Sequence, residues 1–349
     1  MSTLDYKKTP IKKILIFGPN WVGDTIMSTP LVSSLRTSLA QADITVAAKT
    51  YLLPLWKMNP DINRIWEIKA VKKYDAFFYF KLLQRIKKQK FDLVIILPHC
   101  LRYALISLLA NIPYRIGYSI GIRNLFLSDS LTYTQKLRKN HMVENYLNLL
   151  KLIGIKPSKK ELTLNIDPNT HKAVDNIFIK NGLKSGDLII GLAPGAAYGR
   201  AKRWPKDKYA KLAAEIIKKH KAKVIIFIGP EEKKFADDFK SLTSNLPLIL
   251  VDDRSLLEVS AIIKYCLLFI GNDSGLIHIA NAIGVNTIAI FGSTSPQWTR
   301  PYGKNSIIIK KELDCSPCFK KSCPYDTYKC LESIEVKEVL RHISSQLKA

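Results

Sequence analysis

Short apolar runs alternate with amphipathic stretches through the first part of the chain. The apolar runs predict strands, which lie at Ile14–Phe17, Asp43–Ala47, Arg64–Ile68, Leu93–Leu97 and Arg115–Tyr118. Between them, apolar residues recur at helical spacing over Ala76–Lys90 and His141–Ile153. Runs that are apolar without alternation are typical of parallel strands covered on both faces.

A polar segment, Gly154–Pro168, interrupts this pattern and predicts a linker. The alternation then restarts, with strands predicted at Leu188–Ala193, Lys223–Ile228, Leu248–Val251, Leu267–Ile270 and Thr287–Phe291. Helices are predicted at Pro205–His220, Glu231–Leu242, Ser255–Tyr265, Ser274–Ile283 and Ile334–Leu347. The pattern therefore predicts an α/β protein with two Rossmann-like domains, 1–160 and 161–349, that face a central cleft.

The composition agrees with two folded domains, because the chain has 349 residues, of which 47% are hydrophobic. The 54 Lys and Arg residues exceed the 29 Asp and Glu residues, so the formal net charge is +25. Such a charge attracts nucleic acid, an anionic membrane or a phosphorylated substrate, and a Lys-rich composition without function is the alternative.

No apolar run reaches the length of a membrane span, and the run ILIF near the N-terminus is too short for the core of a signal peptide. We therefore expect a cytoplasmic protein whose six cysteines are reduced or bound to metal.

The first candidate motif, GPNWVGD at 18–24, directly follows the first predicted strand. Parallel sheets bind ligands at the carboxyl ends of their strands, where glycines let the backbone approach a substrate. The spacing matches neither a dinucleotide fingerprint nor a Walker A loop. Asp24 is placed to act as a general base, and a helix N-cap is the structural alternative.

The second motif, PGAAYGRAKRWP at 194–205, follows the first strand of the second half. The backbone amides around Gly195, together with the charge of Lys202, suit a diphosphate and would stabilise it as a leaving group. Pro205 is predicted at the first position of a helix. A surface loop with solvated cations is the alternative.

The third motif, GNDSGLIH at 271–278, again joins a strand to a helix. Asp273 and Ser274 can cap this helix, and His278 shares a face with Ser274 one turn earlier, although a structural histidine is the alternative. Glu231 and Glu232 follow another strand and are candidates to accept hydrogen bonds from ribose hydroxyls.

Taken together, these motifs resemble glycosyltransferase family 9, the heptosyltransferases, over nearly the whole chain. The resemblance is carried by GPNWVGDTIMSTP, APGAAYGRAKRWP, IGPEE and GNDSGLIH. It implies a GT-B fold and an inverting transfer of heptose from ADP-heptose onto the lipopolysaccharide inner core, with no metal required for catalysis. The Trp of the first motif and the AKRWP form are most similar to family members that add the second heptose, onto heptosyl-Kdo-lipid A.

The resemblance also implies roles for individual residues. Asp24 would be the catalytic base, and Lys202 would bind the donor phosphates and assist their departure. The rest of the donor site would consist of Gly195, Glu232, Asp273, Ser274, Gly275 and His278.

The N-terminal half would bind the acceptor, and its cations are candidates to meet phosphorylated lipid A and acidic core sugars at the inner membrane. These candidates are Arg115, Arg123, Arg138 and Lys139. For each of them, a solvated surface position is the alternative.

Four cysteines, Cys315, Cys318, Cys323 and Cys330, gather in the segment 314–330. In a reducing compartment such a group suggests a structural Zn or Fe site, and free thiols or oxidised pairs are the alternatives.

Two other functions compete with this interpretation. One is another family 9 transfer: heptosyltransferase I, a third-heptose enzyme or a protein-directed enzyme. The other is a metal-bearing nucleic-acid-binding module that uses the charge and the cysteines. No recognition helix or aromatic RNA-binding motif is visible, so we expect no nucleic-acid partner.

Overall fold

A computed structural model describes residues 10–69, 75–158, 160–167, 170–184, 186–229 and 233–347. The chain divides into two compact units, Met1–Leu164 and Asn165–Ala349, so the division lies slightly beyond the expected boundary at 160.

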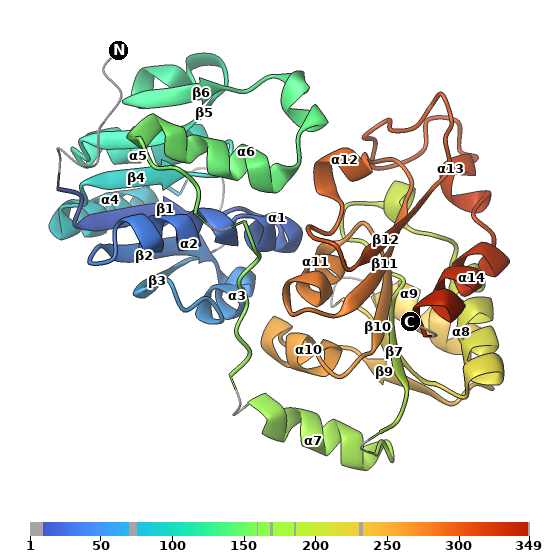
Figure 1. Ribbon diagram of the computed structural model, residues 1–349. Coiled ribbons are helices and arrows are strands. Elements are labelled where there is room, and N and C mark those ends of the chain that lie inside the picture. The colour runs from blue at the N-terminus through green and yellow to red at the C-terminus, as the bar shows by residue number, and fades with distance from the viewer. Residues whose placement is uncertain are drawn as a thin grey trace. The chain divides into compact units, whose positions relative to one another are not determined.

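The first unit is built on a six-stranded sheet in the order β3-β2-β1-β4-β5-β6, and the pairings among these strands are parallel (Figure 1). Its strands are β1 (Lys13–Phe17), β2 (Asp43–Lys49), β3 (Arg64–Ile68), β4 (Leu93–Ile96), β5 (Tyr114–Ser119) and β6 (Asp129–Thr132). Its helices are α1 (Val22–Met27), α2 (Thr29–Ser38), α3 (Leu53–Lys57), α4 (Ala76–Gln89), α5 (Leu101–Leu109) and α6 (Met142–Asn148). Short 3₁₀ turns cover Thr50–Leu52, Gly121–Phe126, Gln135–Lys139 and Leu149–Ile153.

Helices α4 and α5 cover the same face of this sheet. Leu82 and Ile86 of α4 and Ile106 of α5 share one buried cluster with Phe17 of β1, which is why the two helices lie side by side. Asp75 caps α4 by accepting a hydrogen bond from the amide of Phe78 at 2.9 Å. Helices α2 and α6 contact each other in front of the sheet in Figure 1.

The second unit repeats this plan with the order β12-β11-β10-β7-β8-β9, which is the same order when its strands are numbered from β7. Its strands, also paired in parallel, are β7 (Ile189–Ala193), β8 (Lys223–Phe227), β9 (Leu248–Val251), β10 (Leu268–Asn272), β11 (Asn286–Phe291) and β12 (Ser306–Lys310). Its helices are α7 (His171–Lys180), α8 (Lys206–His220), α9 (Lys233–Leu242), α10 (Leu256–Ile263), α11 (Gly275–Ala282), α12 (Pro296–Thr299), α13 (Lys329–Glu332) and α14 (Val336–Gln346). A 3₁₀ turn covers Arg200–Lys202.

A large buried cluster joins α8 and the closing helix α14 to this second sheet. Trp204 and Tyr209 are fully buried in it and meet edge to face, with ring centroids 4.9 Å apart. The indole Nε1 of Trp204 donates to the carbonyl of Ile334 at 3.1 Å, so the only polar atom of this side chain is satisfied. The sequence just after the second motif therefore anchors the end of the chain.

The predicted α/β class and the pair of Rossmann-like sheets are confirmed. The edge strands β6 and β12 were not predicted. Helix α8 begins at Lys206, so Pro205 is its N-cap and not its first residue. The expected helix over 141–153 is α6 followed by a 3₁₀ turn. Among the helices described, none is both long enough and apolar enough to cross a membrane.

Candidate active site

The three sequence motifs lie where the strand order of each sheet reverses. In the first sheet, β1 lies between β2 and β4, and in the second, β7 lies between β8 and β10. Loops that leave neighbouring strands in opposite directions open a crevice at such a point, and open parallel sheets bind their ligands there. The first motif follows β1, whereas the second and third follow the adjacent strands β7 and β10.

Asp273 is the centre of the second unit's candidate site. It directly follows β10, its side chain is 3% exposed, and its Oδ2 atom lies 2.6 Å from the Nζ of Lys202. The same oxygen accepts hydrogen bonds from the hydroxyls of Thr294, at 2.6 Å, and Thr299, at 3.2 Å. Burial alone would raise the pKa of Asp273, but the charges of Lys202 and His278 and these hydrogen bonds outweigh it and lower the pKa. The carboxylate is therefore held ionised.

Lys202, the expected phosphate cation, is thus paired with a carboxylate and only 13% exposed. Its ammonium also lies 5.0 Å from the centre of the Tyr198 ring. An ammonium group has three N–H donors, and Asp273 accepts from one of them, so the remaining donors can serve a ligand.

Asn272 ties the loop after β7 to the end of β10. Its Oδ1 accepts from the amide of Trp204 at 3.0 Å, and its Nδ2 donates to the carbonyl of Pro194 at 2.7 Å and to that of Gly195 at 3.3 Å. The side chain is fully buried, so leaving these groups unpaired would be costly. These hydrogen bonds therefore fix the backbone of the loop formed by the second motif, 194–205, which is called the glycine-rich loop here.

The remaining donor-site candidates lie on helix α11. Ser274 is its N-cap, but its side chain makes no capping hydrogen bond, and Gly275 is the first helical residue. His278 is buried with its Nε2 3.9 Å from Oδ1 of Asp273, so it faces this carboxylate and not the protein surface. Glu232 and its neighbour Glu231 lie outside the described residues.

The cysteine-rich segment packs against the glycine-rich loop. Gly199 has a φ of 150°, and a Cβ there would lie 2.5 Å from the carbonyl oxygen of Lys321. The amide of Ala201 donates to that same carbonyl at 3.0 Å, and the hydroxyl of Tyr198 donates to the carbonyl of Phe319 at 2.8 Å. The segment 314–330 therefore supports the backbone that carries Lys202.

The four thiols of this segment are free and share one neighbourhood. Burial raises the pKa of Cys330, and the charges of Cys318, Cys315 and Cys323 raise it further. Within the described ranges, however, no three or more His, Cys, Asp or Glu side chains are arranged to hold a metal ion. The thiols as placed do not form a metal site, and binding would require them to converge.

In the first unit, Asp24 lies in the first turn of α1, which begins at Val22 after the extended N-cap residue Trp21. Asp24 is therefore inside the helix, and the alternative that it is an N-cap is wrong. The side chain of Asp24 is half-buried, and α1 contacts α6. Burial, and then the charge of Asp24, raise the pKa of Tyr146 on α6, so this hydroxyl stays protonated beside the carboxylate.

A buried cation lies at the carboxyl end of the neighbouring strand β4. Arg123 is 2% exposed, and its Nη2 donates to the carbonyl of Ile96, the last residue of β4, at 3.1 Å. Its Nε and Nη1 are buried without a hydrogen-bond partner among the described residues. Burial, and then the charge of Arg123, lower the pKa of His99, which follows the same strand.

Two of the four candidates for acceptor binding are held by contacts within the first unit. Arg123 is internal, and Arg115 lies near the amino end of β5, where its guanidinium donates to the carbonyls of Phe126 at 2.9 Å and Pro113 at 3.1 Å. Arg115 therefore holds loops together at the sheet edge opposite Asp24. Lys139 is exposed on the 3₁₀ turn 135–139, and Arg138 on the same turn is half-buried.

Several residues of these sites were not singled out from the sequence. Thr294 and Thr299 follow β11, and the strand-end run GSTSP at 292–296 is the signal that could have identified them. Asn272 lies within the third motif, but the sequence predicted no role for it. Nothing in the sequence marked Arg123 as buried, because charge alone does not report the packing of a side chain.

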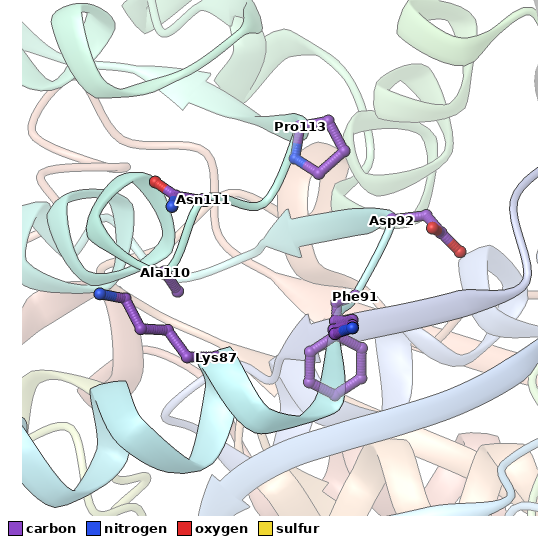
Figure 2. A pocket seen from close by; sticks show the side chains of 7 residues that line it. Lys87, Phe91, Asp92, Ala110, Asn111 and Pro113 are labelled. Atoms are coloured by element: carbon purple, nitrogen blue, oxygen red, sulfur yellow. The ribbon is translucent and has the colours of Figure 1, made fainter.

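A shallow cavity in the first unit lies away from these motifs (Figure 2). It is lined by Lys87 and Lys90 near the end of α4, by Asp92 before β4 and by Asn111 after α5, so it lies at the amino ends of the strands. Oδ2 of Asp92 already accepts hydrogen bonds from the amides of Lys12 and Lys13, both at 2.8 Å. The cavity is therefore not the candidate active site.

Comparison with known proteins agrees with the motifs. The model of glycosyltransferase family 9 (heptosyltransferase) matches residues 79–329, more than half of the chain. The two Rossmann-like units and their strand-end motifs, together with this match, define a glycosyltransferase. The chain belongs to glycosyltransferase family 9, the heptosyltransferases.

The chain is similar to proteins named heptosyltransferase 2 or II and to a further structure of family 9. Lipooligosaccharide heptosyltransferase 2 of Haemophilus influenzae is 31% identical, over 85% of this chain and 88% of the relative. The structure of E. coli ADP-heptose lps heptosyltransferase II is 26% identical with a TM-score of 0.81, over 96% of this chain and 98% of that one. A family 9 structure from Veillonella parvula, 23% identical, has a TM-score of 0.85 over 100% and 99% of the two chains and supports the fold.

The burial of the Lys202–Asp273 pair predicts its effect on stability. Replacing Lys202 with Ala leaves a buried carboxylate without its cation, and we expect the free energy of unfolding to fall by about 3 kcal/mol. The control is Lys206→Ala, because Lys206 also lies 2.6 Å from a carboxylate, that of Asp238, but this pair is 41% and 46% exposed. The control should lose less than about 1 kcal/mol. Urea denaturation measures both values.

The stabilisation that the Lys202–Asp273 pair provides depends on pH in a definite direction. The pKa of Asp273 is lowered in the folded state, so the stabilisation is present at neutral pH and is lost as pH falls through that pKa. The difference between wild type and Lys202→Ala should therefore shrink in acid. Equal losses for Lys202→Ala and Lys206→Ala at neutral pH would contradict the importance of burial.

Proposed function

We propose that this chain transfers heptose from ADP-heptose onto the inner core of lipopolysaccharide, and that it adds the second heptose to heptosyl-Kdo-lipid A. The similarity to heptosyltransferase 2 of H. influenzae, at 31% identity over 85% of the chain, is the observation that carries the proposal. The structural similarity to the E. coli ADP-heptose heptosyltransferase II supports ADP-heptose as the donor.

The second unit binds the donor in this proposal. The diphosphate meets the free N–H donors of Lys202 and the amides at the start of α11, from Gly275 onward. Because Asp273 neutralises Lys202, the site presents oriented donors without a large net charge, so ADP can leave after transfer. Negative charge that develops on the leaving diphosphate is stabilised by donors already in position.

The first unit binds the acceptor and supplies the base. The acceptor hydroxyl attacks the anomeric carbon on the face opposite ADP, Asp24 takes the hydroxyl proton, and the bond to the diphosphate breaks, so the configuration inverts. The unpartnered Nε and Nη1 of Arg123, at the carboxyl end of β4, are suited to an anionic group of the acceptor. Arg138 and Lys139 stay predictions for the same role.

The place of the enzyme in the cell follows from this acceptor. The donor is water-soluble and the acceptor is anchored in a bilayer by lipid A, so we propose a cytoplasmic protein that works at the surface of the inner membrane. We expect peripheral contact with the membrane because the proposed acceptor is itself held in the bilayer.

Transfer to acceptors of defined length tests the proposal. Purified chain is incubated with ADP-heptose and either Kdo-lipid A, heptosyl-Kdo-lipid A or a longer core, and the products are analysed by mass spectrometry. We expect a gain of a single heptose on heptosyl-Kdo-lipid A. Transfer only to Kdo-lipid A would support the first-heptose alternative, and transfer only to the longer core or to a protein would support the remaining family 9 alternatives.

Asp24→Asn tests the assignment of the base. The substitution keeps the size of the side chain but removes the proton acceptor, so we expect kcat to fall on the order of 10²-fold or more. The affinity for ADP should not change, because the proposed donor residues lie in the other unit. Asp129→Asn is the control, since Asp129 begins β6 at the amino ends of the strands. Steady-state kinetics and ADP calorimetry decide, and near-normal turnover of Asp24→Asn would exclude the role.

A structural metal at the four cysteines stays a prediction. Elemental analysis of anaerobically purified protein should find Zn or Fe at about one atom per chain, held by Cys315, Cys318, Cys323 and Cys330. Cys330→Ser should lose the metal, whereas Cys266→Ser should keep it, because Cys266 is buried elsewhere in the same unit. Protein without metal, in which thiol titration finds all six cysteines of the chain reduced, would instead establish free thiols.

A further inference from the structure

Large exposed apolar side chains gather on three elements of the first unit that contact one another. Helix α5 contacts both α4 and the 3₁₀ turn Gly121–Phe126 (α4 and α5 are labelled in Figure 1). Leu105 and Leu109, further along α5, are exposed as well. The exposed side chains nearer the start of α4 and α5 and around the turn are called the apolar rim here: Phe77, Phe80, Leu101, Ile120, Ile122 and Leu125. Single exposed apolar residues are ordinary, but a group on adjoining elements marks an interaction surface.

The topology places the apolar rim at the edge of the sheet that also carries Asp24. Helices α4 and α5 each run back along the sheet toward the start of the next strand, so their first turns lie at the carboxyl ends of the strands. Phe77 and Leu101 belong to those first turns. Ile122 and Leu125 follow the carboxyl end of β5 and are 64% and 75% exposed.

The charged side chains on these three elements are all cationic. Helix α4, helix α5 and the turn 121–126 contain no Asp or Glu. Of their Lys and Arg residues, Arg123 is buried and Lys87 and Lys88 lie in the last turn of α4, which leaves Lys81, Arg85 and Arg102 closer to the rim. The ammonium of Lys81 lies 4.1 Å from the centre of the Phe77 ring, and Nη1 of Arg102 donates to the Tyr79 hydroxyl at 2.6 Å. Lys81 and Arg102 therefore stand beside aromatic side chains and are held there by a cation–π contact and a hydrogen bond.

We propose that the apolar rim inserts into the surface of an anionic phospholipid bilayer. Apolar side chains enter the boundary between headgroups and acyl chains, while Lys and Arg extend their charged ends to the phosphates. Each cation near an anionic leaflet adds about 1 kcal/mol of attraction. The choice of a membrane rests in part on the proposed lipid-linked acceptor, since docking at this edge brings the acceptor's anchor to the side of the sheet that carries Asp24.

A second copy of the chain fits the apolar rim less well. A two-fold contact through the rim would bring the cations of one copy against the same cations of the other, which disfavours association. A bilayer that contains phosphatidylglycerol supplies the opposite charge and an apolar interior together.

Vesicle binding of the full chain tests the proposal without donor or acceptor. We measure co-sedimentation with phosphatidylcholine vesicles and with vesicles that also contain phosphatidylglycerol. Wild type should bind the anionic vesicles more tightly, and added salt should weaken binding. The triple variant Phe80→Ser, Ile122→Ser, Leu125→Ser should lose about tenfold or more in partitioning, because three inserted side chains become polar. Its melting temperature should stay close to that of wild type, since all three side chains are exposed.

The matched control replaces three exposed apolar residues of the second unit: Ile179→Ser, Leu242→Ser, Leu267→Ser. It should bind vesicles like wild type. Equal binding by the two triple variants would overturn the proposal, as would a wild-type dimer in solution that the rim variant alone dissociates without a change in vesicle binding. Loss of transfer to every acceptor with normal vesicle binding would count against the proposed function and leave the membrane surface in place.

Discussion

The ion pair between Lys202 and Asp273 is the interaction on which the proposed donor site depends. It joins loops that are 71 residues apart in the chain but follow neighbouring strands. A carboxylate this deeply buried is stable only with its cation, so neither loop can move away independently. Asn272 joins the same two loops through hydrogen bonds to three backbone groups. The segment 314–330 also forms hydrogen bonds with the glycine-rich loop. Lys202 is therefore in place before a ligand arrives.

The same pairing explains how two carboxylates at strand ends divide their work. The lowered pKa of Asp273 makes it a weak proton acceptor, which suits a residue that positions a cation. Asp24 is half-buried in a first helical turn, beside a tyrosine that keeps its own proton. Placing the proposed base and the proposed leaving-group contacts on separate sheets lets each be tuned by its own surroundings.

Most of the fold was predictable because uninterrupted apolar runs in the sequence predict its buried strands. The runs Ile14–Phe17 and Leu248–Val251 are strands, because a sheet covered by helices removes their apolar side chains from water. The strand β6, with the sequence DSLT, was missed because it lies at an edge and needs little burial.

The candidate site was predictable as three strand-end motifs, but its internal geometry was not. That Lys202 pairs with Asp273, that Arg123 is buried and that Arg115 bonds to backbone carbonyls depend on residues distant in the chain. Charge patterns do not distinguish a solvated cation from a packed one. Contacts of this kind become visible only when the fold brings their partners together.

Each sheet reverses its strand order next to its first strand, and this has a consequence for how such enzymes diversify. The crevice at that point is made by loops after central strands, whereas the outer strands β3 and β9 contribute only scaffold there. Sequence changes within these two strands can accumulate without disturbing the chemistry, but the connection after β12 carries the segment that supports the glycine-rich loop. Under the proposed division of acceptor and donor between the two units, new acceptors can evolve by changes in the first unit while the second is inherited unchanged.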